Sequence, residues 1–156
     1  MYMGKLEELL LEYDDKLIIE EGLLPKGLAG LYQDDLIILE RRLNSKYKLE
    51  TLSEELAHYK ITYGDIRNQS DMLNKKLEIK ARRCGYEILI TLDGIISAYK
   101  NGVHNLYELA NYFEVTESYV IETLKHYKMK FGLSTYHEGY VIKFEPLQVF
   151  EYINIK

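Results

Sequence analysis

A change in hydrophobic periodicity near Leu49 constrains the fold of this chain more than any other feature of its sequence. Before it, short β-rich runs predict strands, and the last two runs flank an acidic pair, as in a hairpin. After it, apolar residues recur every three or four positions, which predicts helices. The switch predicts an α+β fold in which a small antiparallel sheet packs against helices. The expected strands cover residues 17–21, 29–33 and 36–40, and the expected helices cover residues 3–13, 49–62 and 71–90.

Beyond residue 90 the sequence predicts shorter helices and one strand. A three-residue connection, Glu114-Val115-Thr116, joins two of these helices, which is typical of a helix-turn-helix unit. Pro146 has no backbone N–H and is expected to end the strand before it. We therefore expect a core over residues 1–90 and an extension over residues 91–156 that packs on it. The helices of the extension are expected at residues 91–100, 106–113 and 117–130, and its strand at residues 139–144.

Cysteine usage and the first residues predict a compartment. The chain has one cysteine, Cys84, so it cannot form an internal disulfide, which is typical of the reducing cytoplasm. The first residues lack the basic stretch followed by an apolar one that marks a secretory signal. No apolar run approaches the roughly 20 residues that a transmembrane helix needs. We expect a cytoplasmic protein that does not enter a membrane.

The charge distribution argues against nucleic acid as a partner. The net charge is −5, and residues 1–40 hold ten acidic side chains against three lysines. A recognition helix that lies among phosphates is usually more basic than the helix-turn-helix segment of this chain. We expect that segment to pack or to dock a protein, and we do not expect nucleic acid to bind. Its charged residues are Lys125, Lys128 and Lys130 against Glu108, Glu114, Glu117 and Glu122.

The segment Ser53-Glu54-Glu55-Leu56-Ala57-His58 is the strongest candidate for chemistry. Residues four apart share one face of a helix, so Glu54 and His58 can converge on one point with Glu55 beside them. This is the geometry of the H-E-x-x-H motif, in which two histidines hold zinc and the glutamate is the general base. Glu54 replaces the first histidine, and a carboxylate is also a zinc ligand. The competing interpretation is a solvated helix on which Glu54 and His58 simply pair.

A further candidate ligand lies on the next predicted helix. Glu78 shares one stripe with Ala81 and Gly85, and two small residues beside a carboxylate let that helix approach the first one closely. In the alternative interpretation, the small residues only ease packing, and Glu78 pairs with Lys75 or Arg82. The residues alone leave both interpretations open.

Several other polar residues also have two interpretations. Asp65 either orients the motif histidine or turns the chain after the motif helix. Tyr136, His137 and Tyr140 either stabilise an oxyanion or lie on the surface of a hairpin, which is the interpretation we favour. Three more residues are expected to take no part in chemistry: Cys84 in the core, and His104 and His126 at the surface.

Several stretches together resemble the phage and mobile-element branch of the ImmA/IrrE family. The resemblance covers most of the chain from about Gly30 onward, and it implies a gluzincin-like metallopeptidase fold with bound zinc. Within it, His58 and Glu78 match metal ligands and Glu55 matches the general base, whereas Glu54 departs from the family's usual histidine. The matching stretches are Thr51–Tyr59, Gly64–Ile66, Glu78–Arg83, Leu109–Val115 and Tyr140–Leu147.

The resemblance also implies a function. It implies cleavage of a partner, typically a repressor protein that controls a phage or an integrative element. The first hypothesis is therefore a zinc-dependent endopeptidase, in which Glu54, His58 and Glu78 hold the metal and Glu55 takes the proton of the attacking water. The alternative is a degenerate binding module that sequesters its partner without cleavage, which the substitution at Glu54 favours. The third hypothesis is a DNA-binding regulator that uses the helix-turn-helix unit, and the weak basicity of that unit counts against it.

Overall fold

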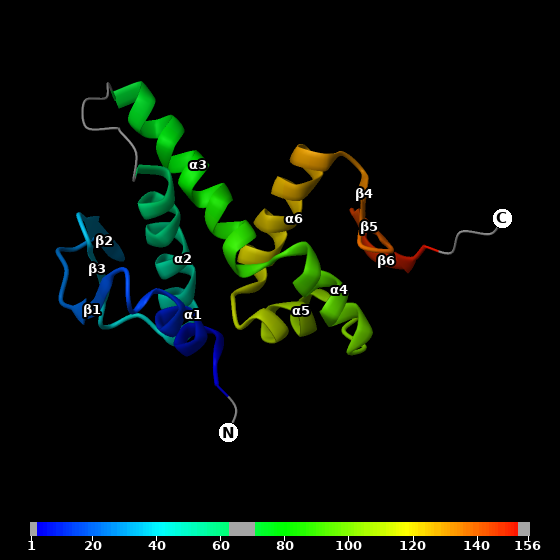
Figure 1. The fold of residues 1–156 in the computed structure, drawn as a ribbon, viewed down its shortest axis with the longest axis horizontal. Coiled ribbons are helices and arrows are strands. Elements are labelled where there is room, and N and C mark those ends of the chain that lie inside the picture. The colour runs from blue at the N-terminus through cyan, green and yellow to red at the C-terminus, as the bar shows by residue number, and fades with distance from the viewer. Residues whose placement is uncertain (1–2, 63–70, 153–156) are drawn as a thin grey trace. The chain divides into compact units, whose positions relative to one another are not determined.

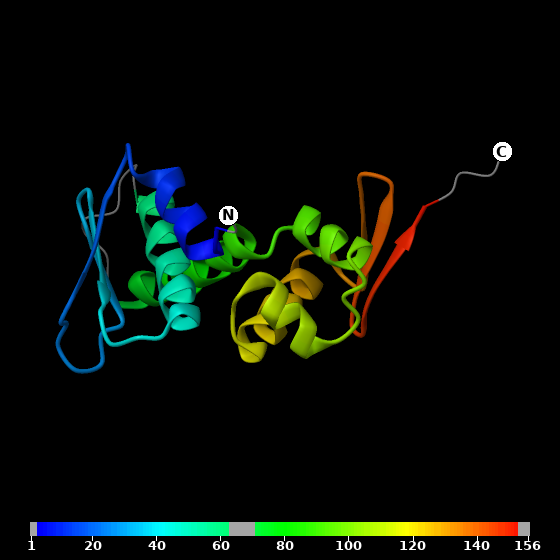
Figure 2. The same cartoon turned by 90° about the horizontal axis from the view of Figure 1, so that it is seen from below.

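The structure is a computed structural model, and it describes residues 3–62 and 71–152 of the chain. It divides into two compact units, Met1–Leu89 and Ile90–Lys156, and each contains helices and a three-stranded sheet. The α+β fold class that the change of periodicity predicts is confirmed. Figure 1 and Figure 2 show the two units from two directions.

The first unit is a sheet and two long helices packed around one another. Its elements are α1 (Lys5–Tyr13), β1 (Ile18–Gly22), β2 (Gly30–Gln33), β3 (Leu36–Glu40), α2 (Ser45–Thr62) and α3 (Asp71–Leu89). The sheet and α3 both contact α2, and α3 runs along it (Figure 1). Asn44 caps α2 by accepting a hydrogen bond from the Tyr47 N–H at 2.9 Å, so this helix begins earlier than its apolar stripe predicts.

The sheet of the first unit is mixed, and the expectation of an antiparallel sheet is wrong. Its strand order is β1-β3-β2, with β2 antiparallel to β3 and β1 parallel to it. The predicted hairpin is present, and Asp34 takes a positive φ of 55° in its two-residue turn. β3 is the most apolar and most buried of the three strands. It lies in the centre of the sheet, where both of its edges are paired with a neighbouring strand.

Glu40 at the end of β3 ties the sheet to the segment that leads into α2. Its carboxylate accepts hydrogen bonds from the backbone N–H groups of Leu24 and Arg42, both at 2.8 Å. The Arg42 guanidinium adds two more, at 2.9 and 3.0 Å. The side-chain hydrogen bond from Arg42, followed by those from the backbone, lowers the pKa of Glu40 to about 2. This buried carboxylate therefore helps to fix where α2 begins.

The core of the first unit lies between β3 and α2. Ile37 and Leu39 of β3 are at most 2% exposed, and Leu52 and Leu56 of α2 are fully buried. The helical periodicity predicted after Leu49 therefore buries Leu52 and Leu56 on one face of α2, whereas Tyr59 on the same face is half-buried. Burial of this stripe against the sheet leaves the adjacent face of α2 to carry polar residues.

The core residues of α3 differ in part from those predicted. Cys84 was expected in the core but is only half-buried, whereas Ala81, Gly85 and Tyr86 are buried. Large side chains would hold two helices apart, so the closest contact runs through small residues. The spacing of the two helices therefore depends on Ala81 and Gly85.

Truncation of Leu56 to alanine is expected to lower the free energy of unfolding by roughly 2–5 kcal/mol. The side chain is fully buried between helix and sheet, so its loss removes apolar contacts and leaves a cavity. Urea denaturation followed by circular dichroism measures the change. Leu11→Ala is the matched control, because Leu11 lies on α1 and is 55% exposed. An equal effect of the two substitutions would contradict the assignment of Leu56 to the core.

The second unit packs three helices against a small antiparallel sheet. Its elements are α4 (Leu92–Lys100), α5 (Leu106–Phe113), α6 (Glu117–Phe131), β4 (Ser134–His137), β5 (Tyr140–Phe144) and β6 (Leu147–Glu151). Tyr127 of α6 is central, since its ring stacks on Phe131 and Phe144 and its hydroxyl donates to the Ile90 carbonyl at 2.6 Å. Thr116 caps α6 by accepting from the Tyr119 N–H, so the predicted connection between α5 and α6 is present.

The sequence missed two strands and one buried residue in the second unit. β4 and β6 flank the predicted strand, and Pro146 lies in the turn before β6, where a missing N–H breaks no pairing. His126 is 8% exposed, so the expectation of a surface histidine is wrong. Its ring lies beside the buried Tyr127, and His126 follows the buried Thr123 by three positions, so the two share one face of α6.

Candidate metal centre

The polar face of α2 carries three of the candidate site residues. Glu54, Glu55 and His58 are all half-buried, whereas Leu52 and Leu56 on the neighbouring face are fully buried. The helix fixes the spacing of Glu54 and His58, and the packing of α2 on the sheet fixes the direction in which they point. The site residues therefore lie at the border of the core and not on a fully solvated helix.

α3 brings the fourth candidate residue to the same place. The Nε2 atom of His58 lies 3.2 Å from Oε2 of Glu78, although the two residues are 20 positions apart in the sequence. One donor atom each from Glu54, His58 and Glu78 lie within 4.8 Å of one another. Arg82 approaches Glu54, with 4.0 Å between Nη2 and Oε1. The structure therefore brings together the three residues that the sequence proposed as ligands.

A close approach of α2 and α3 makes this convergence possible. A Cβ atom on Gly85 would lie 3.2 Å from Ser53 Oγ and 3.3 Å from the Glu54 nitrogen. Both distances are tighter than ordinary packing, so a side chain at position 85 would require α2 to shift by a few tenths of an ångström. Gly85 therefore lies close against α2, and the buried Ala81 and Glu78 lie on the same helix as Gly85.

Glu55 has an unusual electrostatic environment. Its pKa is raised to about 7: burial is the largest cause, the neighbouring His58 opposes the shift, and the negative charges of Glu54 and Glu78 add to it. One wall of its environment is strand β2, where a Cβ on Gly30 would lie 3.2 Å from Glu55 Oε1. A carboxylate with a pKa near neutrality is suited to accept and return a proton.

The chemistry of the donor set fits a metal ion such as zinc. Two carboxylates and one imidazole are ligand types that zinc accepts, and three protein ligands leave one position for water in a catalytic site. The half-buried imidazole and Glu54 lie beside the exposed carboxylate of Glu78, so the group is open to solvent on one side. Residues 54, 58 and 78 could therefore hold such an ion.

Sequence reasoning missed Gly30 as a residue of this site. The only local signal was an isolated glycine within a strand, which often marks a place where another group approaches closely. Asp65, which was considered as a partner of the motif histidine, lies outside the residues that the structure describes.

A second group of metal-ligating residue types lies in the second unit. His137 Nε2 is 2.8 Å from Asp93 Oδ1, and donor atoms of Asp93, His137 and Glu138 lie within 4.8 Å of one another. The hydrogen bond from His137 lowers the pKa of Asp93. Both carboxylates are largely exposed, and the group forms an ion pair that links the start of α4 to the β4–β5 turn. His137 and Tyr136 therefore belong to a surface hairpin within this unit.

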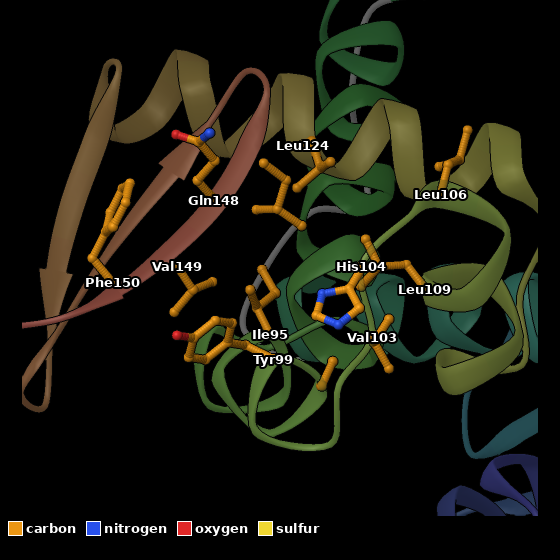
Figure 3. A pocket seen from close by; sticks show the side chains of 12 residues that line it. Ile95, Tyr99, Val103, His104, Leu106, Leu109, Leu124, Gln148, Val149 and Phe150 are labelled. Atoms are coloured by element: carbon orange, nitrogen blue, oxygen red, sulfur yellow. The ribbon is translucent and has the colours of Figure 1, made fainter.

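The second unit also contains an apolar cavity of about 420 Å³. Figure 3 shows side chains of α4, α5, α6 and β6 around it, including Ile95, Leu109, Leu124 and Val149. His104 and Gln148 supply polar atoms at its wall. None of the residues that line the cavity belongs to the Glu54–His58–Glu78 group. The cavity is therefore not part of the candidate metal site.

Comparisons with known proteins place these observations in context. The family model Peptidase_M78, described as the IrrE N-terminal-like domain, matches residues 12–125. This range includes all four candidate site residues and extends from the first unit into the second. No curated protein matches the chain. Across residues 3–62 and 71–152, no helix has both the length and the apolar character needed to cross a membrane.

Proposed function

The chain belongs to the family of IrrE N-terminal-like peptidase domains, and on this premise we propose that it is a zinc-dependent endopeptidase of the cytoplasm that cleaves a regulatory protein, a repressor of a phage or mobile element. One observation carries the proposal. Donor atoms of Glu54, His58 and Glu78 lie within 4.8 Å of one another, and Glu55 lies among them with a raised pKa. If the polar face of α2 were only solvated, there would be no reason for Glu78 of α3 to lie beside Glu54 and His58.

In the proposed mechanism, Glu54, His58 and Glu78 hold the metal and Glu55 handles the proton. Zinc held there supplies Lewis-acid polarisation of a carbonyl and lowers the pKa of a bound water. Glu55 accepts the proton of the attacking water, and its carboxyl group then returns that proton to the leaving amine. Its half-buried carboxylate lies against β2, which limits the positions from which it can act.

The free edge of β2 supports a peptide as the substrate. Leu39 and Ile37 of β3 lie opposite Gly30 and Tyr32, and the Ala29 carbonyl accepts from the Glu40 N–H. In this register, the N–H and C=O groups of Gly30 and Tyr32 point away from β3. No strand among the described residues pairs with that edge. An extended peptide can therefore hydrogen-bond to β2 beside Glu55.

The contacts of α6 support a protein and not nucleic acid as the partner of the second unit. Lys128 forms an ion pair with Glu145, and Lys125 pairs with Glu122. These pairs offset the positive charge that a helix among phosphates would need. We propose that the second unit docks the protein that is cleaved.

A binding module without peptidase activity is the second candidate. His58 and Glu78 form a hydrogen bond with each other, and Glu54 approaches Arg82, so these groups have partners even without a metal. In this function the chain sequesters its partner, and Glu54 stands where the family has a histidine because no metal is needed.

The proposal is tested by cleavage of a defined partner. The purified chain is loaded with zinc or stripped with a chelator, its metal content is measured by mass spectrometry, and it is incubated with the repressor encoded beside it. We expect one zinc per chain and cleavage at a single bond, read on a gel and by mass spectrometry of the fragments, in the zinc-loaded sample alone. An intact repressor that stays bound to the chain would favour the binding module.

Replacement of Glu54 with histidine is expected to raise zinc affinity about tenfold, which corresponds to about 1.4 kcal/mol. Imidazole suits zinc better than a second carboxylate does in a site that already holds Glu78. Calorimetric titration with zinc measures the change. Glu122→His on exposed α6 is the control for zinc binding by an added surface histidine. Equal or weaker binding by Glu54→His would show that the site is specialised around Glu54 or is not a metal site.

A further inference from the structure

We infer that Gly30 is a positioning residue for Glu55. Because position 30 has no side chain, β2 can lie against α2 there, and this contact sets the position of the Glu55 carboxylate. The inference rests on the proposed function for its catalytic consequence. The close contact between Gly30 and Glu55 is given by distances within the first unit. It does not depend on whether the protein is a peptidase.

The space beside Gly30 is too small for any side chain. A Cβ atom there would lie 2.6 Å from Thr51 Cγ2, 3.1 Å from Glu55 Cγ and 3.2 Å from Glu55 Oε1. The first distance is far below van der Waals contact, and the other two are tighter than ordinary packing. Thr51 and Glu55 are one helical turn apart, so both meet the strand at the same point. A methyl group at position 30 must therefore displace β2, Thr51 or Glu55.

Backbone conformation does not explain a glycine at this position. Gly30 is the first residue of β2, is paired with Leu39 of β3, and is not among the residues with a positive φ. Glycine within a strand is unfavourable, because it loses more conformational freedom on folding and offers no side chain to pack. Gly22 at the end of β1 differs, since a Cβ there would meet Ile38 Cγ2 at 3.4 Å, which is ordinary contact. Of these two strand glycines, Gly30 is therefore the one that lies tightly against α2.

The neighbours of Gly30 differ in how they can respond to an added methyl group. Thr51 is β-branched, so its χ1 angle is restricted to two rotamers within the helix and its Cγ2 atom has few positions to which it can move. Removal of that methyl group, as in Thr51→Ser, eliminates the shortest contact and leaves the two contacts with Glu55. The pair of neighbours thus allows the packing role of Gly30 to be separated from its role at Glu55.

The test compares Gly30→Ala, Thr51→Ser, the double variant and the control Gly22→Ala. Thermal midpoint, zinc content and the kcat and KM for repressor cleavage are measured for each full-length chain. We expect Gly30→Ala to lower the thermal midpoint and Thr51→Ser to restore it in the double variant. We expect kcat to stay about 10²-fold below wild type in both variants that carry Gly30→Ala, because small misplacements of a catalytic group have effects of this size. KM and zinc content should change little, and Gly22→Ala should match wild type.

Two results would overturn the inference. Wild-type kcat in the double variant would mean that Gly30 only makes room for Thr51. Wild-type kcat in Gly30→Ala would mean that the methyl group is accommodated without effect.

A wild-type chain that cleaves nothing would contradict the proposed function but would still leave Gly30 testable. Glu55→Ala is then combined with Gly30→Ala and Thr51→Ser, and the thermal midpoint is read alone. The inference requires that loss of the Glu55 side chain reduces the destabilisation caused by Gly30→Ala. Equal destabilisation with and without the Glu55 side chain would refute contact between the two positions.

Discussion

Replacement of Glu55 with glutamine is expected to abolish cleavage of the partner while the fold and metal binding persist. Glutamine is nearly isosteric with glutamate, but it cannot accept the proton of the attacking water. Proton transfer by a positioned base contributes roughly 10²–10⁴-fold to rate, so the loss should be of that size. Single-turnover cleavage of the repressor by zinc-loaded wild type and Glu55→Gln measures it. Zinc content and thermal midpoint provide the controls, because Glu55 is not one of the three proposed ligands.

Co-expression with the repressor separates cleavage from sequestration in cells. We expect wild type to relieve repression and to produce a shortened repressor on an immunoblot, whereas Glu55→Gln produces neither. The binding module makes a different prediction, since both forms would relieve repression and leave the repressor intact. An intact repressor that loses its activity in the presence of either form would therefore reject the peptidase.

The metal-free protein is expected to lose stability as pH rises from about 4.5 to about 7. Glu55 has a pKa of about 7 in the folded protein against an ordinary value of 4.5, mainly because burial penalises its charged form. In that pH range the folded state binds more protons than the unfolded state, so the free energy of unfolding falls as pH rises. The contribution is fully present below pH 4.5 and is lost above the folded pKa. Its upper bound is about 3 kcal/mol.

Urea denaturation in the presence of a chelator, at several pH values across this range, measures the effect. Other groups titrate in the same range, so the informative quantity is the difference between wild type and Glu55→Gln. The variant carries no ionisable group at position 55 and should be more stable than wild type above pH 7, by up to about 3 kcal/mol. Parallel pH profiles for the two proteins would show that Glu55 is not desolvated in the folded state.

Local sequence predicted most helices and strands, because the periodicity and the turn residues that specify them lie within a few positions of one another. The hairpin around Asp34 and Asp35 and the helix-turn-helix connection at Glu114-Val115-Thr116 were both predicted and both observed. Where local signals were weak, the prediction failed. β6 was missed because Pro146 was interpreted as the end of β structure, although it lies in a turn between two strands.

Long-range packing decided what local patterns left open. No local pattern predicts that β3 lies in the centre of the sheet or that β1 runs parallel to it. His126 was expected at the surface because no partner residue lies at a matching spacing, but it shares the buried face of α6 with Thr123. Burial of such residues depends on segments far away in the chain.

The sequence by itself determined the identity of the candidate ligands and the alignment of two of them. Glu54 and His58 share a face because 3.6 residues per turn put positions four apart side by side, whatever the rest of the chain does. Only the tertiary structure decided that Glu78 reaches His58, that Glu55 is partly removed from solvent, and that Gly30 lies against it. These relations join α2 to α3 and to β2, and their distances depend on close packing at Gly85 and Gly30. Helical periodicity acts within one element, whereas distances between elements are set by the side chains that separate them.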